Sequence, residues 1–335
     1  MSTRSKKNKK IEKIIRCSVF ALAVIMLITS ALMFMRAWEK NRGVYNGDDI
    51  SSSSETVYNG KEYVLKDDIE TFLVLGLDKF DGFKAVESYN NDMQADFLML
   101  FVFDDEAKKC TAVHINRDTM VDVNVLGVAG NKINTVTQQI ALAHTYGNGR
   151  DVSCRNTANS VSKLLGGIKV NHYISLTMDS VRIINDSIGG VKVKVLSDFS
   201  GIDDTLKKGE SVTLKGEQAL LYVRSRQGLN DSSNTDRMKR QRQYIEAFYN
   251  KALKMAKENT DFAVNALKDL SEYIVSDRSI AQMQELADKF IGYDFEGIRV
   301  IEGDNLTGEK YMEFYADEKS VNEIVFDLFY KDKTK

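Results

Sequence analysis

Proline is absent from this sequence of 335 residues, although average usage would place roughly 17 in a chain of this length. Nothing in the sequence accounts for that absence. Cysteine is scarce as well, because Cys17, Cys110 and Cys154 are too few and too scattered for a disulfide framework or a zinc site. A Cys110–Cys154 bridge is the only pairing that can be conceived, and we do not expect it to form.

Histidine and the common catalytic motifs are equally sparse. His114, His144 and His172 lie far apart and show neither HExxH nor CxxC spacing, so we expect them in the core or at the surface. The sequence has no GxSxG elbow, no Walker loop and no GxGxxG, since "YGNGRD" lacks the third glycine. Nothing in these patterns suggests a nucleotide cofactor.

The charge is nearly balanced, with 46 basic and 48 acidic residues and a formal net charge of -2. This balance gives the chain no overall positive potential that would attract a nucleic acid, so any polyanion binding must come from a local basic patch. The 43% of hydrophobic and 28% of charged residues suit one large or two ordinary globular domains and argue against disorder.

The N-terminal region contains one long apolar run. Residues 17–35 carry no charge, and as a helix they span roughly 28 Å, close to the hydrocarbon thickness of a bilayer. Residues 1–16 hold seven basic residues and one acid, so the positive-inside rule predicts a cytoplasmic tail and an extracytoplasmic remainder. A cleaved signal peptide is the alternative, but its apolar core should be shorter. Residues 36–66 are polar and indicate an extracytoplasmic linker.

The remaining residues, 67–335, mix short apolar runs with helical patterns. Strands are expected at residues 71–78, 96–104 and 110–116, and helices at 134–146 and 153–165. Later segments add a strand at 172–178, a helix through 179–189, a strand at 191–196, a helix at 216–224 and a longer helix from about Asn234 to about Glu258. The tail adds two helices, a strand near 297–303 and a last helix from Asp317. This pattern predicts a three-layer α/β/α domain with a mixed central sheet.

Acidic and basic residues stand at the ends of the first three expected strands. Asp78 follows the first strand, Asp96 begins the second, and Arg117 and Asp118 follow the third. If neighbouring strands are antiparallel, all four residues reach the same edge of the sheet. Two carboxylates from different strand ends, together with waters and a substrate phosphate, are what Mg²⁺ favours. The alternative is that Asp78 and Asp96 only end their strands as turn residues.

Residues 221–244 concentrate five arginines and one lysine. Clustered arginines are the usual partners of a multiply charged phosphate, because the guanidinium fork bonds two phosphate oxygens and stays charged. Three of the polar side chains share a face in the first turns of a helix, whose N-terminus also favours an anion. The candidate ligands are Arg224, Arg226, Arg237, Arg240 and Gln241. The alternative is a solvated basic face partnered by Asp231 and Asp236.

From about Thr71 to Lys251 the sequence resembles the LytR-CpsA-Psr family of bacterial cell-envelope glycopolymer transferases. Each matching piece is short, but the pieces come in the order of the family. They are the strand ending in "GLD", then "QADFLMLFVFD", "INRDTMVDV", "KINT", "NDSIGGVKVKV", "LKGEQALLYVRSR" and "DRMKRQRQ". The resemblance implies a catalytic domain that uses Mg²⁺ to transfer a glycopolymer, such as a teichoic acid or capsule, from a polyprenyl pyrophosphate carrier to peptidoglycan.

The resemblance also implies roles for single residues. Asp78 and Asp96 would hold the metal, and Asp118 and Asp236 would orient arginines or handle a proton. The residues expected to hold the pyrophosphate are Arg117, Arg224, Arg226, Arg237 and Gln241, with Arg240 beside them. Two positions depart from the family, because Gln94 stands where an arginine is usual and Asn116 where a proline is usual. The missing arginine affects catalytic strength or substrate choice, since a neutral amide cannot offset phosphate charge.

We therefore expect a single-pass protein of the bacterial cell membrane whose partners are a polyprenyl pyrophosphate-linked glycopolymer, peptidoglycan and the membrane itself. A sugar hydroxyl would attack the phosphorus next to the glycopolymer, and polyprenyl phosphate would leave. Two alternatives stay open, namely a hydrolase of pyrophosphate carriers and a non-enzymatic regulator that binds an envelope polyanion. A nucleic-acid partner is not expected, because only the 16-residue tail is predicted to be cytoplasmic.

Overall fold

The computed structural model describes residues 52–78, 93–226, 234–259, 261–309 and 311–334. The expected membrane helix at residues 17–35 and most of the expected linker lie outside these ranges. Within the described ranges, no helix is both long and apolar enough to cross a membrane.

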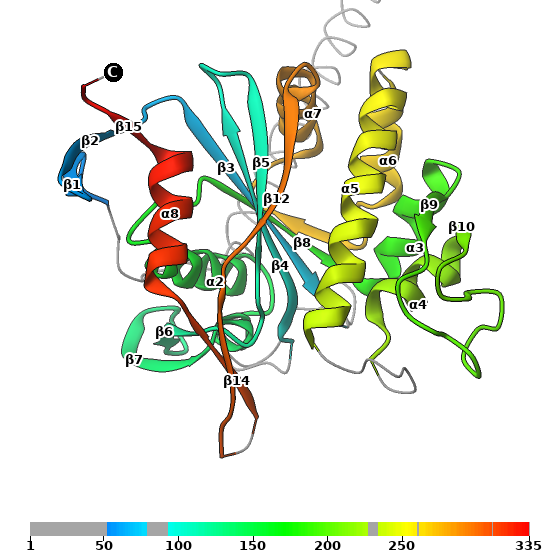
Figure 1. Cartoon of the computed structure of the whole chain (residues 1–335), viewed down its shortest axis with the longest axis horizontal. Coiled ribbons are helices and arrows are strands. Elements are labelled where there is room, and N and C mark those ends of the chain that lie inside the picture. The colour runs from blue at the N-terminus through cyan, green and yellow to red at the C-terminus, as the bar shows by residue number, and fades with distance from the viewer. Residues whose placement is uncertain (1–51, 79–92, 227–233, 260, 310, 335) are drawn as a thin grey trace, which may run out of the picture. The chain divides into compact units, whose positions relative to one another are not determined.

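A six-stranded mixed sheet forms the centre of the domain, in the order β11-β8-β3-β4-β5-β12 (Figure 1). Antiparallel pairing joins β3 to β4, β4 to β5 and β8 to β11, and parallel pairing joins β3 to β8 and β5 to β12. The strands are β3 (Ile69–Leu77), β4 (Ala95–Asp104), β5 (Lys109–Ile115), β8 (His172–Thr177), β11 (Ile274–Ser276) and β12 (Asp294–Val300). The mixed sheet predicted from the sequence is thereby confirmed.

Successive side chains of β3 point to opposite faces of this sheet, as the two-residue period of a strand requires. Leu73, Leu75 and Leu77 belong to a core shared with helices α2 (Asp151–Leu164) and α8 (Glu318–Phe329). Phe72 and Val74 belong instead to a cluster with residues of α6 (Asp261–Asp269) and α7 (Ile280–Phe290). Figure 1 shows α8 and the long helix α5 (Asn234–Glu258) on opposite sides of the sheet, so the three-layer architecture is confirmed.

A third apolar cluster supports the segment that carries the arginines. It joins α3 (Met178–Ser187), the ribbon of β9 (Val191–Lys194) and β10 (Ser211–Leu214), α4 (Gly216–Arg224) and residues 244–255 of α5. Tyr222 of α4 is fully buried there and stacks on Phe199. One packed core therefore holds α4 against α5, and these are the two helices that carry the arginines.

Some elements differ from the sequence prediction. Residues 134–146, expected as a helix, form most of strand β7 (Lys132–Gln139) and the 3-10 helix η1 (Ile140–Thr145), and β7 pairs with β6 (Met120–Leu126). Part of the expected linker folds as β1 (Glu55–Tyr58) and β2 (Lys61–Leu65), which pair with each other, and β2 also pairs with β15 (Tyr330–Asp332). An additional hairpin of β13 (Gly303–Thr307) and β14 (Met312–Ala316) leaves the sheet after β12.

The three histidines and the two described cysteines are buried. Burial lowers the pKa of His114 to about 3 and that of His144 to about 4, so both imidazoles are neutral. Cys110 and Cys154 are free thiols whose pKa burial raises to about 12. The bridge between them does not form.

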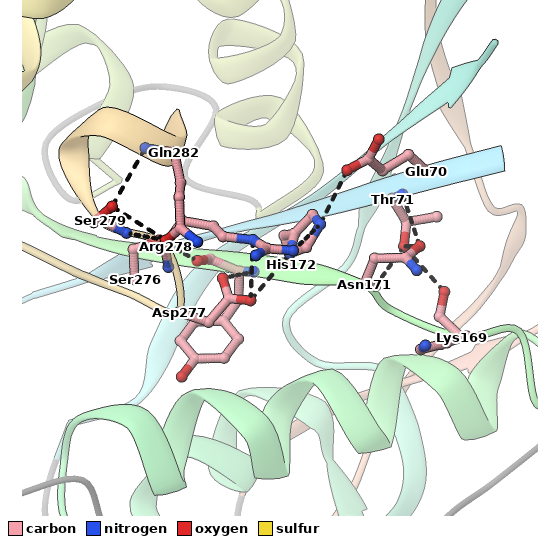
Figure 2. A network of polar contacts seen from close by, with 11 residues as sticks. Glu70, Thr71, Lys169, Asn171, His172, Ser276, Asp277, Arg278, Ser279 and Gln282 are labelled. Carbon is pink, nitrogen blue, oxygen red and sulfur yellow. Dashed lines mark hydrogen bonds and ion pairs between the residues drawn. The ribbon is translucent and has the colours of Figure 1, made fainter. Parts of the chain in front are cut away.

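His172 is the centre of a polar network at the edge of the sheet where β3 and β8 begin (Figure 2). Its Nδ1 lies 3.0 Å from Oδ2 of Asp277, and its Nε2 lies 3.0 Å from Oε1 of Glu70. Arg278 lies against the same ring, and Lys289 of α7 pairs with Glu70 at 3.1 Å. The network ties β3, β8, β11 and α7 together at the edge that lies opposite the strand ends bearing Asp78 and Asp96.

Candidate active site

The ends of three strands deliver charged residues to one edge of the sheet, as the sequence predicts. Leu77 pairs with Ala95 and Leu98 pairs with Ile115, so the residues next to these pairs share that edge. The register between β3 and β4 shifts here, because Gly76 faces Phe97 and Leu77 faces Ala95. Asp96 is the residue left without a partner, and such bulges re-aim side chains next to functional sites.

Arg117 is the hub of this edge. Its guanidinium forms ion pairs with Asp96 and with Asp118, whose Oδ1 lies 3.4 Å from Nε. Nη2 donates to Gln94 Oε1 at 2.7 Å. Burial lowers the pKa of Arg117, while the neighbouring Asp118 acts in the opposite direction. Gln94, which stands where the family usually has an arginine, therefore holds Arg117 by its amide oxygen.

Asp118 is buried and fixed from several sides. Asn116 Oδ1 accepts from the backbone N–H of Asp118 at 3.0 Å, an Asx turn that occupies the place of the proline usual in the family. Gln139 Nε2 donates to Oδ1 at 3.0 Å and Asn234 Nδ2 donates to Oδ2 at 3.1 Å. Burial raises the pKa of Asp118, and Arg117 opposes that rise. These contacts give Asp118 the role of orienting Arg117.

The second group of arginines comes from α4, the segment after it and α5. Arg224 is half exposed, with Nε 3.5 Å from Asp78 Oδ1. Arg237 is buried and donates from Nη2 to Asn234 Oδ1 at 2.7 Å, but its Nε has no hydrogen-bond partner among the described residues. Burial and the nearby charges of Arg226 and Arg117 lower the pKa of Arg237 to about 10. The guanidiniums of the two groups are therefore close enough to repel one another.

The structure places Arg240 and Gln241 in the interior and not at a ligand-facing surface. The Arg240 guanidinium is fully buried, and its donors bind the carbonyl of Tyr222 at 3.0 Å, the hydroxyl of Ser197 at 2.7 Å and the carbonyl of Ser225. Gln241 donates to the carbonyl of Val223 at 3.2 Å. Both side chains thus fasten the end of α4 onto α5, because unpaired backbone carbonyls at a buried helix end need donors.

Asp236 pairs with Lys239 at 2.9 Å on the same helix, and its role toward the arginines stays a prediction. Two amides that the sequence does not indicate are central to the site. Gln139 and Asn234 both hold Asp118, and Asn234 also binds Asn116 and Arg237. No sequence motif marks a glutamine at the end of a polar strand, but an asparagine at the first residue of a helix is a recognisable signal.

A cavity of about 770 Å³ opens at this edge. Arg117, Asp118 and Arg226 line it together with Asn234 and Thr235 from the first turn of α5. The described residues that complete the lining are Gln94, Gln139, Leu142, Asn305, Tyr311 and Met312. Both arginine groups and a helix N-terminus therefore meet at one cavity, which is an arrangement suited to an anion.

The described residues contain no cluster of three or more His, Cys, Asp or Glu side chains that could enclose a metal. Asp78 and Asp96 nevertheless end adjacent strands beside the arginines, which balance their charge in the structure. Mg²⁺ commonly binds one or two carboxylates and completes its coordination with waters and substrate phosphates. The pair therefore fits a cation that arrives together with a phosphate ligand.

Comparison with known proteins identifies the family. The model of the LytR_cpsA_psr family matches residues 33–328. This chain belongs to the LytR-CpsA-Psr family. A relative from Bacillus licheniformis, named polyisoprenyl-teichoic acid–peptidoglycan teichoic acid transferase TagU, is 25% identical over 97% of this chain and 98% of its own length. A TagU of the same name from Enterococcus faecalis is 26% identical over 84% of this chain and 83% of its own length.

Solved structures share the fold. The crystal structure of B. subtilis TagV superposes with a TM-score of 0.58 at 23% identity and covers 79% of this chain and 97% of TagV. A structure of TagT bound to LIIa-WTA gives a TM-score of 0.60 at 21% identity, over 85% of this chain and 97% of TagT. The α/β architecture with its mixed sheet is thus that of the LytR-CpsA-Psr structures.

Proposed function

We propose that this protein transfers an anionic glycopolymer, such as a teichoic acid, from a polyprenyl pyrophosphate carrier to peptidoglycan. The observation that carries the proposal is one cavity lined by Arg117, Arg226 and Asp118. Asp96 pairs with Arg117 and Asp78 pairs with Arg224 beside it, and the charge of Arg237 is felt by Arg117 and Arg226. Relatives that match nearly the whole chain are named as transferases of this kind. A diphosphate is the ligand that satisfies several guanidiniums at once.

In this reaction a sugar hydroxyl of the acceptor attacks the phosphorus next to the glycopolymer, and polyprenyl phosphate leaves. Negative charge spreads over the phosphoryl oxygens during the transfer, so positioned cations lower the barrier. Arg117 and Arg226 line the cavity and bind these oxygens, while Arg237 adds positive charge behind Asn234. Asp118 keeps Arg117 in place through the Nε contact. No covalent intermediate on the protein is needed.

Asp78 and Asp96 are the residues that would hold Mg²⁺, which would supply further charge stabilisation to the phosphates. The donor set fits, because both carboxylates are present beside the phosphate-binding arginines. In the structure these carboxylates form ion pairs with Arg224 and Arg117. When the donor binds, each arginine would bind phosphate oxygens and each carboxylate would bind the metal, so the new contacts replace the ion pairs.

An apolar cavity of about 400 Å³ on the other helical layer suits the polyprenyl tail. Phe72, Phe101 and Phe103 of the sheet form one wall, and residues of α5, α6 and α7 form the rest. α5 reaches both cavities, because Thr235 lines the anionic one and Phe248 the apolar one. At about 1.5 Å per residue these two positions lie roughly 20 Å apart along the helix. One extended carrier can therefore follow α5 from pyrophosphate to tail.

We place the domain on the outer side of the bacterial cell membrane, anchored by residues 17–35 as a single span with residues 1–16 in the cytoplasm. The support is the charge pattern of the sequence. A membrane-bound carrier and a cell-wall acceptor both require this location.

Purified full-length chain should release polyprenyl phosphate and attach glycopolymer to peptidoglycan when supplied with a lipid-linked donor and Mg²⁺. We expect Arg226→Ala to weaken donor binding by 10- to 100-fold, about 1.4–3 kcal/mol, as for the loss of a charged hydrogen-bond donor to a phosphate. Arg226 is a suitable probe because it is exposed and forms no ion pair with any carboxylate of the described residues. Lys239→Ala, exposed on α5, is the matched control.

The same assay separates the other functions. Release of polyprenyl phosphate with free glycopolymer as the product would indicate a hydrolase. Donor binding without any Mg²⁺-dependent release would indicate a binding protein. Equal donor affinity in wild type and Arg226→Ala would contradict the pyrophosphate site itself.

A further inference from the structure

The cavity at the catalytic edge has two chemically different walls. One wall carries Arg117 and Arg226 and the first turn of α5. The other wall comes from the β13–β14 hairpin and presents Asn305, Tyr311 and Met312, none of which is charged. A phosphate belongs against the first wall. The second wall has the composition of a site for a neutral, hydroxyl-bearing ligand.

The hairpin is fixed to the arginine wall by direct hydrogen bonds. The N–H of Phe314 donates to the carbonyl of Asp118 at 2.9 Å, and Phe314 also forms a parallel bridge with Thr119. Gln139 Nε2 donates both to Asp118 Oδ1 at 3.0 Å and to the carbonyl of Met312 at 2.6 Å. One buried amide thus sets the position of the hairpin relative to the residue that orients Arg117.

Tyr311 is the most exposed large apolar side chain of this hairpin, at 69%. Exposed aromatic rings beside a polar cavity are typical of binding surfaces, because the ring offers an apolar face and the hydroxyl a hydrogen bond. Pyranose rings match such a surface, since their C–H face lies flat on an aromatic ring while their hydroxyls bind amides. Asn305 supplies an amide on the same wall.

The direction of the reaction assigns this wall to one of the two substrates. In-line transfer places the attacking oxygen opposite the leaving oxygen. The leaving polyprenyl phosphate lies toward α5, because α5 continues to the apolar cavity. The attacking hydroxyl must then come from the side that faces away from α5, where Figure 1 shows the β13–β14 hairpin extending from the catalytic edge of the sheet.

We propose that the β13–β14 wall, formed by Asn305, Tyr311 and Met312, is the subsite for the acceptor sugar of peptidoglycan, with Tyr311 stacking on the sugar ring. This inference rests on the proposed transfer function. It adds the position of the acceptor and the residues that select a glycan over water.

The test uses the full-length chain in detergent micelles, a lipid-linked glycopolymer donor and soluble uncrosslinked peptidoglycan strands as the acceptor. Tyr311→Ala should raise the KM for the strands about tenfold, with kcat and donor affinity within twofold of wild type. Tyr311→Phe keeps the ring and should stay close to wild type. Tyr315→Ala is the matched control, because Tyr315 is a half-exposed tyrosine of β14 that does not line the cavity.

A second measurement does not depend on turnover. Saturation-transfer NMR with the strands alone should show transfer to sugar protons in wild type and Tyr315→Ala, and a clear loss in Tyr311→Ala. The acceptor subsite is refuted if Tyr311→Ala keeps the wild-type KM and NMR signal, or if Tyr315→Ala changes both as much. Failure of the wild-type chain to bind the donor or release polyprenyl phosphate would instead refute the transfer function, so the two failures are distinguishable.

Discussion

At the scale of single residues, Arg240 shows how two similar arginines of one helix take different roles. Arg237 and Arg240 are one helical turn apart, and the sequence pattern predicts that both bind the ligand. In the structure Arg240 binds two backbone carbonyls and the Ser197 hydroxyl, whereas Arg237 keeps a buried Nε without a partner among the described residues. The difference arises because the carbonyls at the end of α4 pack beside Arg240. The sequence around Arg240 does not predict that position.

Arg240→Met should lower the free energy of unfolding by about 2–4 kcal/mol, because three buried acceptors lose their donors. The variant should also bind the donor more weakly, since the Ser225 carbonyl that Arg240 holds lies between Arg224 and Arg226. Urea denaturation followed by circular dichroism measures the first effect. Lys239→Met, at the exposed neighbouring position, is the control. A stability equal to that of the control would contradict the positioning role.

The charged residues at the strand ends were predictable from the sequence, while the amides of Gln139 and Asn234 that hold Asp118 were not. Asp78, Asp96 and Arg117 flank apolar runs whose antiparallel order fixes a shared edge, so pattern alone brings them together. Gln139 and Asn234 reach Asp118 from segments 21 and 116 residues away in the chain. Amides carry no charge pattern that could reveal such contacts.

At the scale of secondary-structure elements, the prediction succeeds where burial dominates. The central strands and helices α2, α4, α5 and α8 have long apolar runs or amphipathic patterns, and they lie close to the expected positions. The β6–β7 ribbon is different, because β7 exposes much of its surface and reads "KINTVTQQ", with little apolar alternation. A strand defined mainly by its partner and not by the core leaves no clear period in the sequence.

The turn between α3 and β9 offers a matched pair of glycines. Both have positive φ, at +70° for Gly189 and +87° for Gly190, but a Cβ on Gly190 would lie 2.5 Å from the Leu214 carbonyl oxygen. On Gly189 it would meet only Lys251 Nζ, at 3.9 Å. Gly189→Ala should therefore cost about 1–2 kcal/mol from its backbone conformation, whereas Gly190→Ala should cost clearly more.

Thermal unfolding of both glycine variants tests this difference. The Gly190 variant should also lose donor affinity, because Leu214 ends β10 immediately before the helix that carries Arg224. Equal melting temperatures for the two variants would show that the backbone of β10 moves away from the added Cβ without lowering the stability of the protein.

At the scale of the whole domain, the three layers separate the charged and apolar parts of the proposed donor site. The strand ends at one edge gather the arginines and carboxylates, while the face of the sheet toward α5, α6 and α7 encloses an apolar cavity. Because α5 contributes to both, its 25 residues couple the two parts of the proposed carrier site. A long apolar tail and a diphosphate can then bind to chemically distinct regions of one domain.

This division predicts that the two parts can be disabled separately. In wild type, affinity should rise from inorganic pyrophosphate to geranyl and farnesyl pyrophosphate, because each added isoprene unit buries apolar surface. Ala287→Phe fills the apolar cavity from α7 and should abolish this rise while leaving the affinity for inorganic pyrophosphate unchanged. Ala281→Phe, exposed on the same helix, is the control. Calorimetric titration with the three ligands measures the effect, and a rise that persists in Ala287→Phe would place the tail outside this cavity.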